Sequence, residues 1–445
     1  MMTSNSNDRL DRDTLIATFH SFKTPRKDWR VGGEFERAVV RPDGQPVGYD
    51  DPDGIRFILE QLAQRDGWDK VRENGQVIAL SKINEVGGTA TITLEPGGQI
   101  ELSGAPHRSL AALEQEMHEN RNALLAIAEN HNLRWIAAGL TPIASMHDIT
   151  WMPKGRYQVM RDYLPQYGDL ALHMMKGTCS VQCNFDYRDE MDCAAKVRLC
   201  SGLSALTTAI FSNSPLSQNR PNGFKSFRGH IWTRTDPARC GFPPGLRDTY
   251  THEKWVDYLL DVPMMFYCKD DIFLPAHGRS FRSFMEQGID GHFPNATDWA
   301  LHQTSVFPEV RIKHTIEVRG ADCVNHNLAL AFCAIFTGLL YCDTALDEGL
   351  SLVKDVERFG THAERFDIAC RDGLGGTVGG RTLGDWASDL GEIAERGLRA
   401  CLPKDEHLLT PLLEQIESGR SPAQDLLDAW ARDPSPESVI RAAAY

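Results

Sequence analysis

Short acidic motifs in this chain have a spacing that would place several carboxylates on one side of a sheet. Glu34 and Glu36 stand two residues apart, and Glu317 stands two residues before Arg319. In a β-strand, side chains two apart share a face, so each motif directs two charged groups to the same side. If these strands are neighbours, their charged groups meet in one cavity.

A further acidic pair belongs to a predicted hairpin. Residues 92–101 predict a strand, a tight turn at 96–98 and a second strand. This pairing sets Glu95 opposite Gln99 and places Glu101 diagonally across on the same face. Converging carboxylates repel one another strongly unless cations lie among them. Oxygen ligands without a cysteine and histidine set favour Mg²⁺ or Mn²⁺, the ions that accompany nucleotide phosphates.

The alternative is that each glutamate is a solvated surface residue, which is the commoner state of a single glutamate on a strand. Apolar residues alternate with these acids, among them Phe35, Ile100 and Val318. Such alternation indicates strands that are at least half buried. We therefore favour one shared site.

Length and charge restrict the class of protein. A chain of 445 residues could form two or three domains, or one enzyme built around an extended sheet. Acidic residues outnumber basic ones by 61 to 47, for a net charge of −14, and there is no basic run. We expect no nucleic acid and no membrane as partner, and a small molecule instead. The longest apolar stretch, 328–342, is too short to span a bilayer and predicts a buried helix.

The cysteines and the N-terminus suggest a reducing compartment. The 11 cysteines are scattered without a Cys-x-x-Cys pair, and residues 1–12 lack an apolar signal core. These features favour a cytoplasmic location with free thiols. Cys179 and Cys183 are expected to pack on the strand face opposite to Gln182 rather than to bind metal.

The chain is predicted to alternate between strands and helices. Strands are expected at 31–41, 76–83, 89–103, 133–141, 177–187 and 309–320. Helices are expected at 53–65, 109–131, 191–212, 252–260 and 326–342, and through an amphipathic tail at 383–442. The segment 213–250 is rich in Asn and Pro and is predicted to be a loop that covers a binding site. The glycine-rich run 373–380 lacks a Gly-Lys-Ser/Thr ending, so a flexible loop is favoured over a phosphate loop.

Several motifs carry a resemblance to a known family. In chain order they are LEPGGQ (94–99), KGRY (154–157), VQCNFD (181–186), PNGF (221–224), HIWT (230–233), FPEVR (307–311) and EVRGAD (317–322). Together they resemble the plant and proteobacterial type of glutamate–cysteine ligase, from about residue 30 to the C-terminus. Where plant members carry Leu-Arg after paired methionines, this chain has Lys176-Gly177. This departure leaves the amine partner open.

The resemblance implies a fold and a domain plan. We expect an α/β (α+β) protein with the catalytic fold of glutamine synthetase, a curved antiparallel sheet that forms a funnel-like active site with helices packed outside. We expect one catalytic domain over 1–445, with the sheet and active site in 13–382 and a helical C-terminal part in 383–445.

The resemblance also implies an activity. It is the ATP-dependent joining of the γ-carboxylate of L-glutamate to L-cysteine through γ-glutamyl phosphate, which gives γ-glutamylcysteine, ADP and phosphate, the first step of glutathione biosynthesis. The cofactors would be ATP and Mg²⁺, or Mn²⁺, and the partners small molecules only, with a monomer or homodimer as the active form. Two alternatives are a γ-glutamyl ligase with another amine acceptor and a guanidino-type phosphotransferase of related fold.

The roles of individual residues follow from the same resemblance and from the reaction's need to neutralise phosphate charge. The implied metal ligands are Glu34, Glu36, Glu95, Glu101, Gln182 and Glu317. Substrate would be held by the carboxylate-binding arginines Arg156 and Arg228, with Asn184 and Trp232. The nucleotide would contact Arg311, Lys313 and Arg319, and the catalytic set would be Glu36, Glu317, Arg319 and Lys313.

Overall fold

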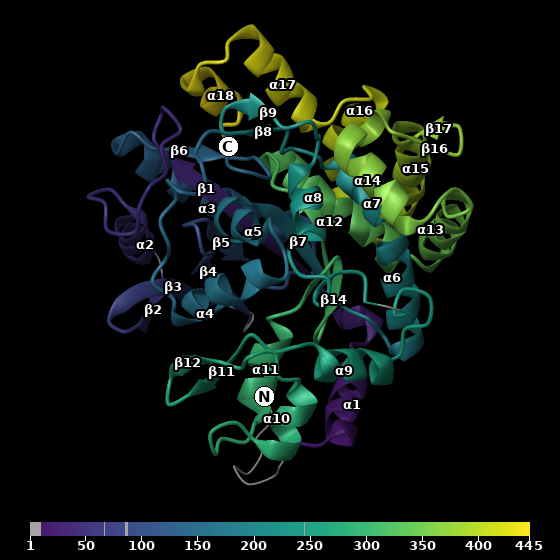
Figure 1. The fold of residues 1–445 in the computed structure, drawn as a ribbon. Helices are drawn as coiled ribbons and strands as arrows, with labels where there is room; N and C mark the ends of the chain where they lie inside the picture. Colours follow the sequence, from purple (N-terminus) through teal and green to yellow (C-terminus); the bar gives the residue numbers. More distant parts are fainter. Residues whose placement is uncertain (1–9, 66, 85–87, 244) are drawn as a thin grey trace.

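A nine-stranded sheet organises the computed structural model, which describes residues 10–65, 67–84, 88–243 and 245–445 (Figure 1). Its strands are β1 Val31–Val40, β2 Asp69–Glu73, β3 Gln76–Ile83, β4 Thr89–Leu94, β5 Ile100–Ser103, β6 Arg134–Ile136, β7 Ser180–Phe185, β14 Val310–Ile312 and β15 Ile316–Asp322. The order is β14-β15-β7-β1-β5-β4-β3-β2, with β6 also paired to β1, and every pair is antiparallel. The predicted mixed fold on an antiparallel sheet is confirmed.

The β4–β5 hairpin has the predicted register. Thr93 pairs with Glu101, and the amide of Glu95 donates to the carbonyl of Gln99 at 2.9 Å. The turn needs glycine, because a Cβ at Gly97 would lie 2.1 Å from a backbone carbonyl oxygen of the neighbouring chain segment. The turn therefore packs closely against the end of the helix that precedes β7.

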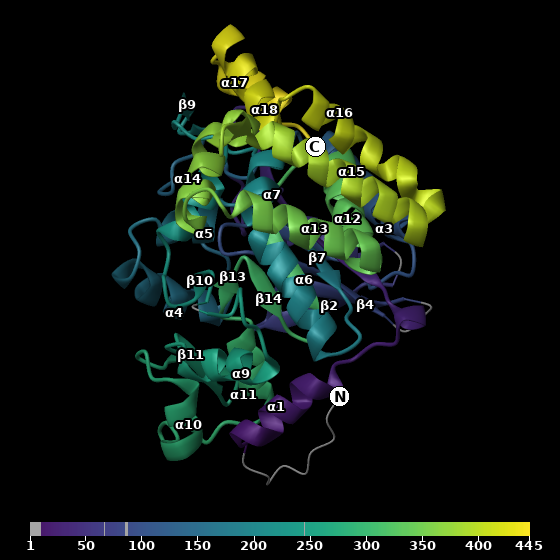
Figure 2. The ribbon, with the colours of Figure 1, turned by 90° about the vertical axis from the view of Figure 1, so that its right-hand side faces the viewer.

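Helices cover the apolar face of the sheet (Figure 2). They are α2 Ile55–Ala63, α3 Leu110–Asn130, α6 Glu190–Gly202, α7 Ser204–Ile210, α12 His326–Tyr341, α13 Asp343–Val356, α14 His362–Asp372 and α15 Leu383–Cys401. Helix α12 lies against β1 and β7, α3 lies against β1, and α15 packs along α12. The tail continues with η4 Pro403–Leu409, α16 Thr410–Glu417, α17 Pro422–Arg432 and α18 Pro436–Ala442.

The remaining elements are α1 Arg12–Ser21, η1 Arg26–Asp28, α4 Gly155–Tyr163, η2 Leu164–Gln166, α5 Ala171–Gly177, β8 Leu216–Ser217, β9 Arg220–Pro221, α8 Phe227–Thr233, β10 Cys240–Gly241, α9 His252–Asp261, β11 Phe266–Lys269, β12 Ile272–Pro275, α10 Phe281–Gln287, α11 Ala296–Gln303 and β13 Phe307–Pro308. Among them, α1, α9, α10, α11, β11 and β12 lie below the sheet in Figure 1, and β8 and β9 lie at the top. Helix α4 packs against the β11–β12 hairpin, and α1 packs against α9.

Two predicted strands are shorter than expected. The strand at 133–141 ends at Ile136, because the next amide, of Ala137, donates to Ala443 near the C-terminus, outside the sheet. The strand at 177–187 starts only at Ser180, since residues up to Gly177 complete helix α5. Lys176 and Gly177 therefore both belong to helix α5, although a strand was predicted from residue 177.

Other predicted segments are more structured or more broken than expected. The helix at 191–212 is divided into α6 and α7 at Leu203, next to Gly202, whose missing side chain admits Val353. The segment 213–250, of which Pro244 lies outside the described residues, is not simply a loop, because it contains helix α8 and short strands. The glycine-rich run forms η3 Gly373–Gly375 and a small hairpin of β16 Thr377–Val378 and β17 Arg381–Thr382.

All 11 cysteines are free, and Cys179 and Cys183 are buried as expected. One apolar core extends from Leu15 in α1 to Ile416 in α16. The division of the chain at residue 383 stays a prediction. Among the described helices none is by itself long and apolar enough to cross a membrane; α12 and α13 pass that test only as a pair bent by 100°.

Candidate active site

Adjacent strands bring four carboxylates onto one face of the sheet. Glu36 on β1 stands directly opposite Glu101 on β5, and Glu34 stands two residues before it on the same face. Glu95 follows the end of β4, beside Glu101. Because side chains alternate, Phe35 between the two β1 acids is buried on the helix side. The four acids border a cavity of about 270 Å³.

The carboxylates repel one another in this cavity. Burial and the charges of Glu317 and Glu101 raise the pKa of Glu34 to about 7. Burial and the charges of Glu101 and Glu95 raise the pKa of Glu36 to about 8. The pKa of Glu101 is raised for the same reasons. Without a cation Glu34 and Glu36 hold protons near neutral pH, so the set of hard oxygen donors fits a divalent ion such as Mg²⁺.

We expect the metal-free protein to lose stability as pH rises from about 5 to about 8.5. The folded protein keeps protons on Glu34 and Glu36 up to pKa values of about 7 and 8, whereas an unfolded chain releases them near 4.5. The folded state thus binds more protons in this window, and the stabilisation is lost as they leave. Melting temperatures measured in EDTA across this pH range test the expected decrease, and Glu36→Gln should make the melting temperature less dependent on pH. An equal slope in that variant would contradict the assignment.

Glu317 is the centre of a cation cluster. It is fully buried, and both of its oxygens accept from Arg311, at 3.0 and 2.8 Å. Lys313 lies 3.1 Å from one of these oxygens, and Arg319 donates to the other. Burial alone would raise the pKa of Glu317, but the three cations outweigh it and hold the pKa well below the ordinary value. The structure thus surrounds Glu317 with cations rather than leaving its oxygens open to a metal.

Two amides on β7 contact the acids, and one of them, Gln182, also contacts a cation. The side-chain oxygen of Gln182 accepts from Arg319, and its nitrogen lies 3.4 Å from Glu36. Asn184 donates to Glu34 at 2.8 Å. The oxygen that would make Gln182 a metal ligand is therefore already engaged by an arginine.

The expected substrate residues occupy different positions. Arg156 on α4 lines the cavity, and its buried Nε has no hydrogen-bond partner among the described residues. Arg228 on α8 is buried, donates to the backbone carbonyl of Arg319 at 3.0 Å and lies 3.9 Å from Asp322. Trp232 packs on Phe307, with ring centroids 5.7 Å apart. Only Arg156 of this set borders the cavity with an unpaired donor.

The structure adds residues that the sequence did not single out. Lys154 and Tyr157 both donate to the carbonyl of Leu94, beside the acidic hairpin. Burial, assisted by the neighbouring Arg156, lowers the pKa of Lys154 to about 8. The KGRY motif contained the signal for these residues, although only its arginine received a role.

An apolar wall of the cavity was also missed. Met160 on α4 and Met265 and Phe266 at β11 line it together with Phe307 of β13. Phe307 begins the FPEVR motif, but Met265 and Phe266 lie outside every motif, so only the packing of α4 against the β11–β12 hairpin reveals them.

The departure from the plant motif lies outside this lining. Lys176 is in the last turn of α5, its ammonium donates to the carbonyl of Met146, and it stands 5.2 Å from the centroid of the Trp151 ring. Neither Lys176 nor Gly177 borders the cavity. The difference therefore gives no support to a changed amine acceptor.

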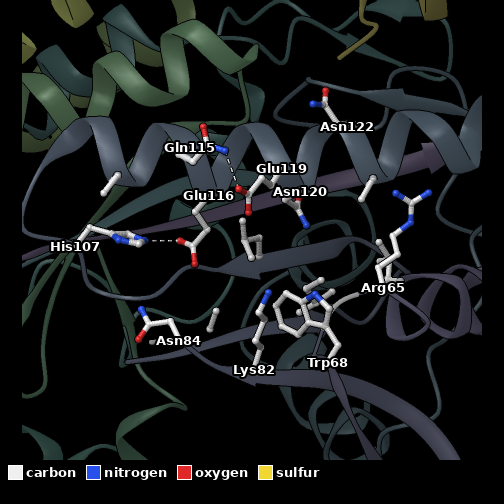
Figure 3. Close-up of a pocket in the computed structure, with 16 residues that line it drawn as sticks. Arg65, Trp68, Lys82, Asn84, His107, Gln115, Glu116, Glu119, Asn120 and Asn122 are labelled. Atoms are coloured by element: carbon white, nitrogen blue, oxygen red, sulfur yellow. Dashed lines mark hydrogen bonds and ion pairs between the residues drawn. The ribbon is translucent and has the colours of Figure 1, made fainter. Parts of the chain in front are cut away.

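A larger cavity, of about 520 Å³, lies on the helix-covered face beneath α3 (Figure 3). Ile92 and Leu102 line it, and they alternate with the cavity-facing Thr93 and Glu101 of the acidic site. His107 Nε2 lies 3.0 Å from Glu116 there, and the same carboxylate accepts from the backbone amide of Ala105 at 3.1 Å. Among the described residues that line it, there is no comparable set of converging carboxylates and cations.

Comparison with solved structures defines the class of fold. The fold is similar to that of a glutamate–cysteine ligase of Francisella tularensis solved in complex with AMP, with a TM-score of 0.55 and 12% identity over 93% of this chain and 87% of that one. The molecule thus has a glutamate–cysteine ligase fold.

Sequence comparison then gives the family. The family model of glutamate–cysteine ligase family 2 (GCS2) matches residues 30–443. Chloroplastic glutamate–cysteine ligase B of Oryza sativa subsp. japonica is 37% identical, covering 96% of this chain and 86% of its own length, and the chloroplastic enzyme of Arabidopsis thaliana is 36% identical, covering 95% and 80%. The chain belongs to glutamate–cysteine ligase family 2, as its motifs predicted.

One expectation is corrected by these relatives. A cytoplasmic location was inferred from the polar N-terminus and the scattered cysteines. The similar curated enzymes are chloroplastic, so that inference is wrong. Free thiols and the lack of an obvious signal core do not distinguish one reducing compartment from another.

Proposed function

We propose that this protein is an ATP-dependent ligase that joins the γ-carboxylate of L-glutamate to L-cysteine, forming γ-glutamylcysteine, ADP and phosphate. The observation that carries this proposal is the cavity in which four carboxylates of the sheet face Arg156, Arg311, Lys313 and Arg319. Family membership supports the same reaction. Two anionic reactants must meet, and this arrangement supplies both cation-binding groups and fixed cations.

The acidic wall is the proposed binding site for divalent ions. Glu34, Glu36, Glu95 and Glu101 would hold Mg²⁺, with Mn²⁺ as the alternative. When bound, these ions neutralise phosphate charge and draw the nucleotide and glutamate together. Ser103 keeps Glu101 oriented by donating to it at 2.7 Å.

The cations opposite are proposed to contact the nucleotide phosphates. Arg311, Lys313 and Arg319 keep fixed positions because all three contact the buried Glu317. A guanidinium that is already oriented loses little conformational freedom when phosphate arrives. Glu317 is thus a positioning residue in this proposal, and its role as a metal ligand stays a prediction from the family motif.

Arg156 is proposed to bind a carboxylate of glutamate, and the apolar wall to exclude water from the reactive acyl phosphate. The cysteine amine attacks the acyl carbon, phosphate leaves, and the amine proton passes to a phosphate or carboxylate oxygen. Met265 and Phe266 are buried beside this position and offer no group that could hydrolyse the intermediate. No enzyme nucleophile is needed.

Product analysis tests the reaction. With MgATP and glutamate, addition of cysteine is expected to release ADP and phosphate in equal amounts with γ-glutamylcysteine. A panel of other amino acids should react more slowly. A faster acceptor would move the assignment to a different γ-glutamyl ligase, and a phosphorylated product without an amide would indicate a phosphotransferase. AMP and pyrophosphate as products would contradict phosphoryl transfer altogether.

The variant Arg156→Lys should raise KM for glutamate more than KM for ATP. Lysine keeps the charge but lacks the two-pronged donor that matches a carboxylate, so a loss of about 1–3 kcal/mol in kcat/KM for glutamate is expected. The matched control is Arg161→Lys on the same helix, where the side chain is partly exposed next to Asp162. If KM for ATP rises while that for glutamate stays constant, Arg156 belongs to the nucleotide site.

We also propose that residues 1–445 act as one catalytic domain, with 383–445 as a helical part, and that the active form is a monomer or homodimer. The packing of α15 along α12 supports the first point. Light scattering at working concentrations tests the second, since a larger assembly would contradict it.

A further inference from the structure

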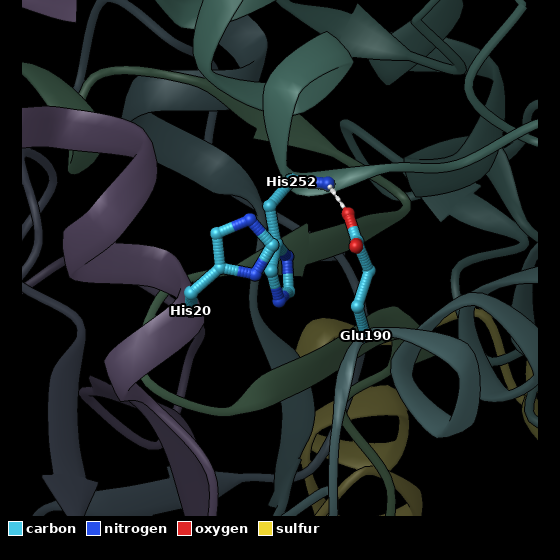
Figure 4. A group of neighbouring side chains, drawn as sticks. All are labelled: His20, Glu190 and His252. Carbon is cyan, nitrogen blue, oxygen red and sulfur yellow. Dashed lines mark hydrogen bonds between the residues drawn. The ribbon is translucent and has the colours of Figure 1, made fainter. Parts of the chain in front are cut away.

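A second group of metal-binding side chain types lies away from the carboxylate cavity. His20 near the end of α1, Glu190 at the start of α6 and His252 at the start of α9 converge at one place (Figure 4). One ligand atom from each lies within 4.8 Å of the others. None of these residues borders the proposed catalytic cavity.

The two inner residues are already oriented. The backbone amide of His252 donates to Glu190 Oε1 at 2.6 Å, and Nδ1 of His252 lies 2.9 Å from the hydroxyl of Tyr250. These contacts fix the imidazole and leave its Nε2 and the other carboxylate oxygen without a hydrogen-bond partner among the described residues. A hydrogen bond from the second ring nitrogen is the usual support of a metal-binding histidine.

The outer residue is free to close the site. His20 is exposed, its ring centroid lies 5.0 Å from that of His252, and no hydrogen bond to its ring is found in the described part of the chain. Ligand atoms around a tetrahedral ion with bonds of about 2.0–2.2 Å stand roughly 3.3–3.6 Å apart, so the three ligand atoms must draw closer together. The exposed His20 is the side chain with room to move.

We propose that His20, Glu190 and His252 bind one Zn²⁺ ion, with water in the fourth position. Two imidazoles and one carboxylate are a zinc donor set, whereas the cavity acids are all hard oxygens that suit Mg²⁺. The ion links α1 to α6 and α9. Bound there, the ion holds the N-terminal helix to the body of the enzyme.

The test uses the full-length protein, from which metal is first removed with a chelator. The metal-free protein is then reconstituted with Zn²⁺ or Co²⁺, and excess Mg²⁺ is present to compete for the carboxylate cavity. We expect one tightly bound Zn²⁺, a rise in melting temperature, and an intense visible spectrum of tetrahedral Co²⁺ with nitrogen ligands. His20→Asn and Glu190→Gln should each weaken Zn²⁺ binding at least about tenfold and abolish the rise in melting temperature. His147→Asn, which changes another exposed histidine, should behave as wild type.

Ligase turnover with MgATP should be the same in His20→Asn as in wild type, which shows that the variant is folded and separates this site from catalysis. The proposal is overturned if His20→Asn retains Zn²⁺ with wild-type affinity. It is equally overturned if Co²⁺ bound to the wild-type protein shows only the weak spectrum of an octahedral ion with oxygen ligands.

Discussion

The variant Glu36→Gln is expected to lose turnover by about two orders of magnitude or more, while its metal-free form melts no lower than the wild type. Glu36 stands opposite Glu101 and carries a pKa raised to about 8, so the metal-free protein gains nothing from its charge. Catalysis needs that charge to hold the divalent ions. Steady-state rates at saturating Mg²⁺ and melting in EDTA measure the two effects.

A matched control is Glu129→Gln, an exposed glutamate on α3 that should change neither rate nor melting temperature. Near-normal turnover of Glu36→Gln at saturating Mg²⁺ would remove Glu36 from the proposed metal site. A marked drop in the melting temperature of its metal-free form would mean that the Glu36 carboxylate is charged and stabilising without metal, which contradicts its raised pKa.

The variant Glu317→Gln should, in contrast, destabilise the metal-free protein. Removing this charge leaves Arg311, Lys313 and Arg319 next to one another without their shared anion. Breaking a buried ion pair in this manner costs about 3–5 kcal/mol, and the cations would lose their fixed positions, so turnover should also collapse. Urea unfolding of the metal-free protein measures the cost.

The comparison between the two glutamates is the decisive part of this experiment. Both substitutions are isosteric, and both residues lie on the same face of the sheet. If metal-free Glu317→Gln were as stable as the metal-free wild type, the buried ion pairs of Glu317 with its three cations would not stabilise the fold as expected. Wild-type turnover would exclude any positioning role.

Local patterns predicted the parts of the site that depend on alternation within a strand. The two-residue spacing of Glu34 and Glu36, and the hairpin that carries Glu95 and Glu101, determine which face each acid occupies. The family motifs then connected distant segments that no short-range rule could join. The antiparallel sheet was expected only from the resemblance that these motifs carry.

Contacts between segments far apart in the chain could not be predicted from local patterns. The engagement of Gln182 by Arg319 depends on β15 pairing with β7, although 137 residues separate the two side chains. The apolar wall at Met265 depends on a hairpin packing against α4. The short strand at 134–136 and the divided helix at Leu203 reflect tertiary contacts that override local propensity.

Strand β1 has one face in the apolar core and the other in the acidic cavity, so it cannot tolerate the insertion or deletion of a single residue. Loss of one residue beside Phe35 would turn the following side chains over, sending Glu36 among apolar helices and a core residue into the acidic cavity. The turn at Asn74 and Gly75, between the exposed edge strand β2 and β3, carries no such double role. Insertions and deletions among relatives should therefore gather at that edge of the sheet and be absent from β1, β5, β7 and β15.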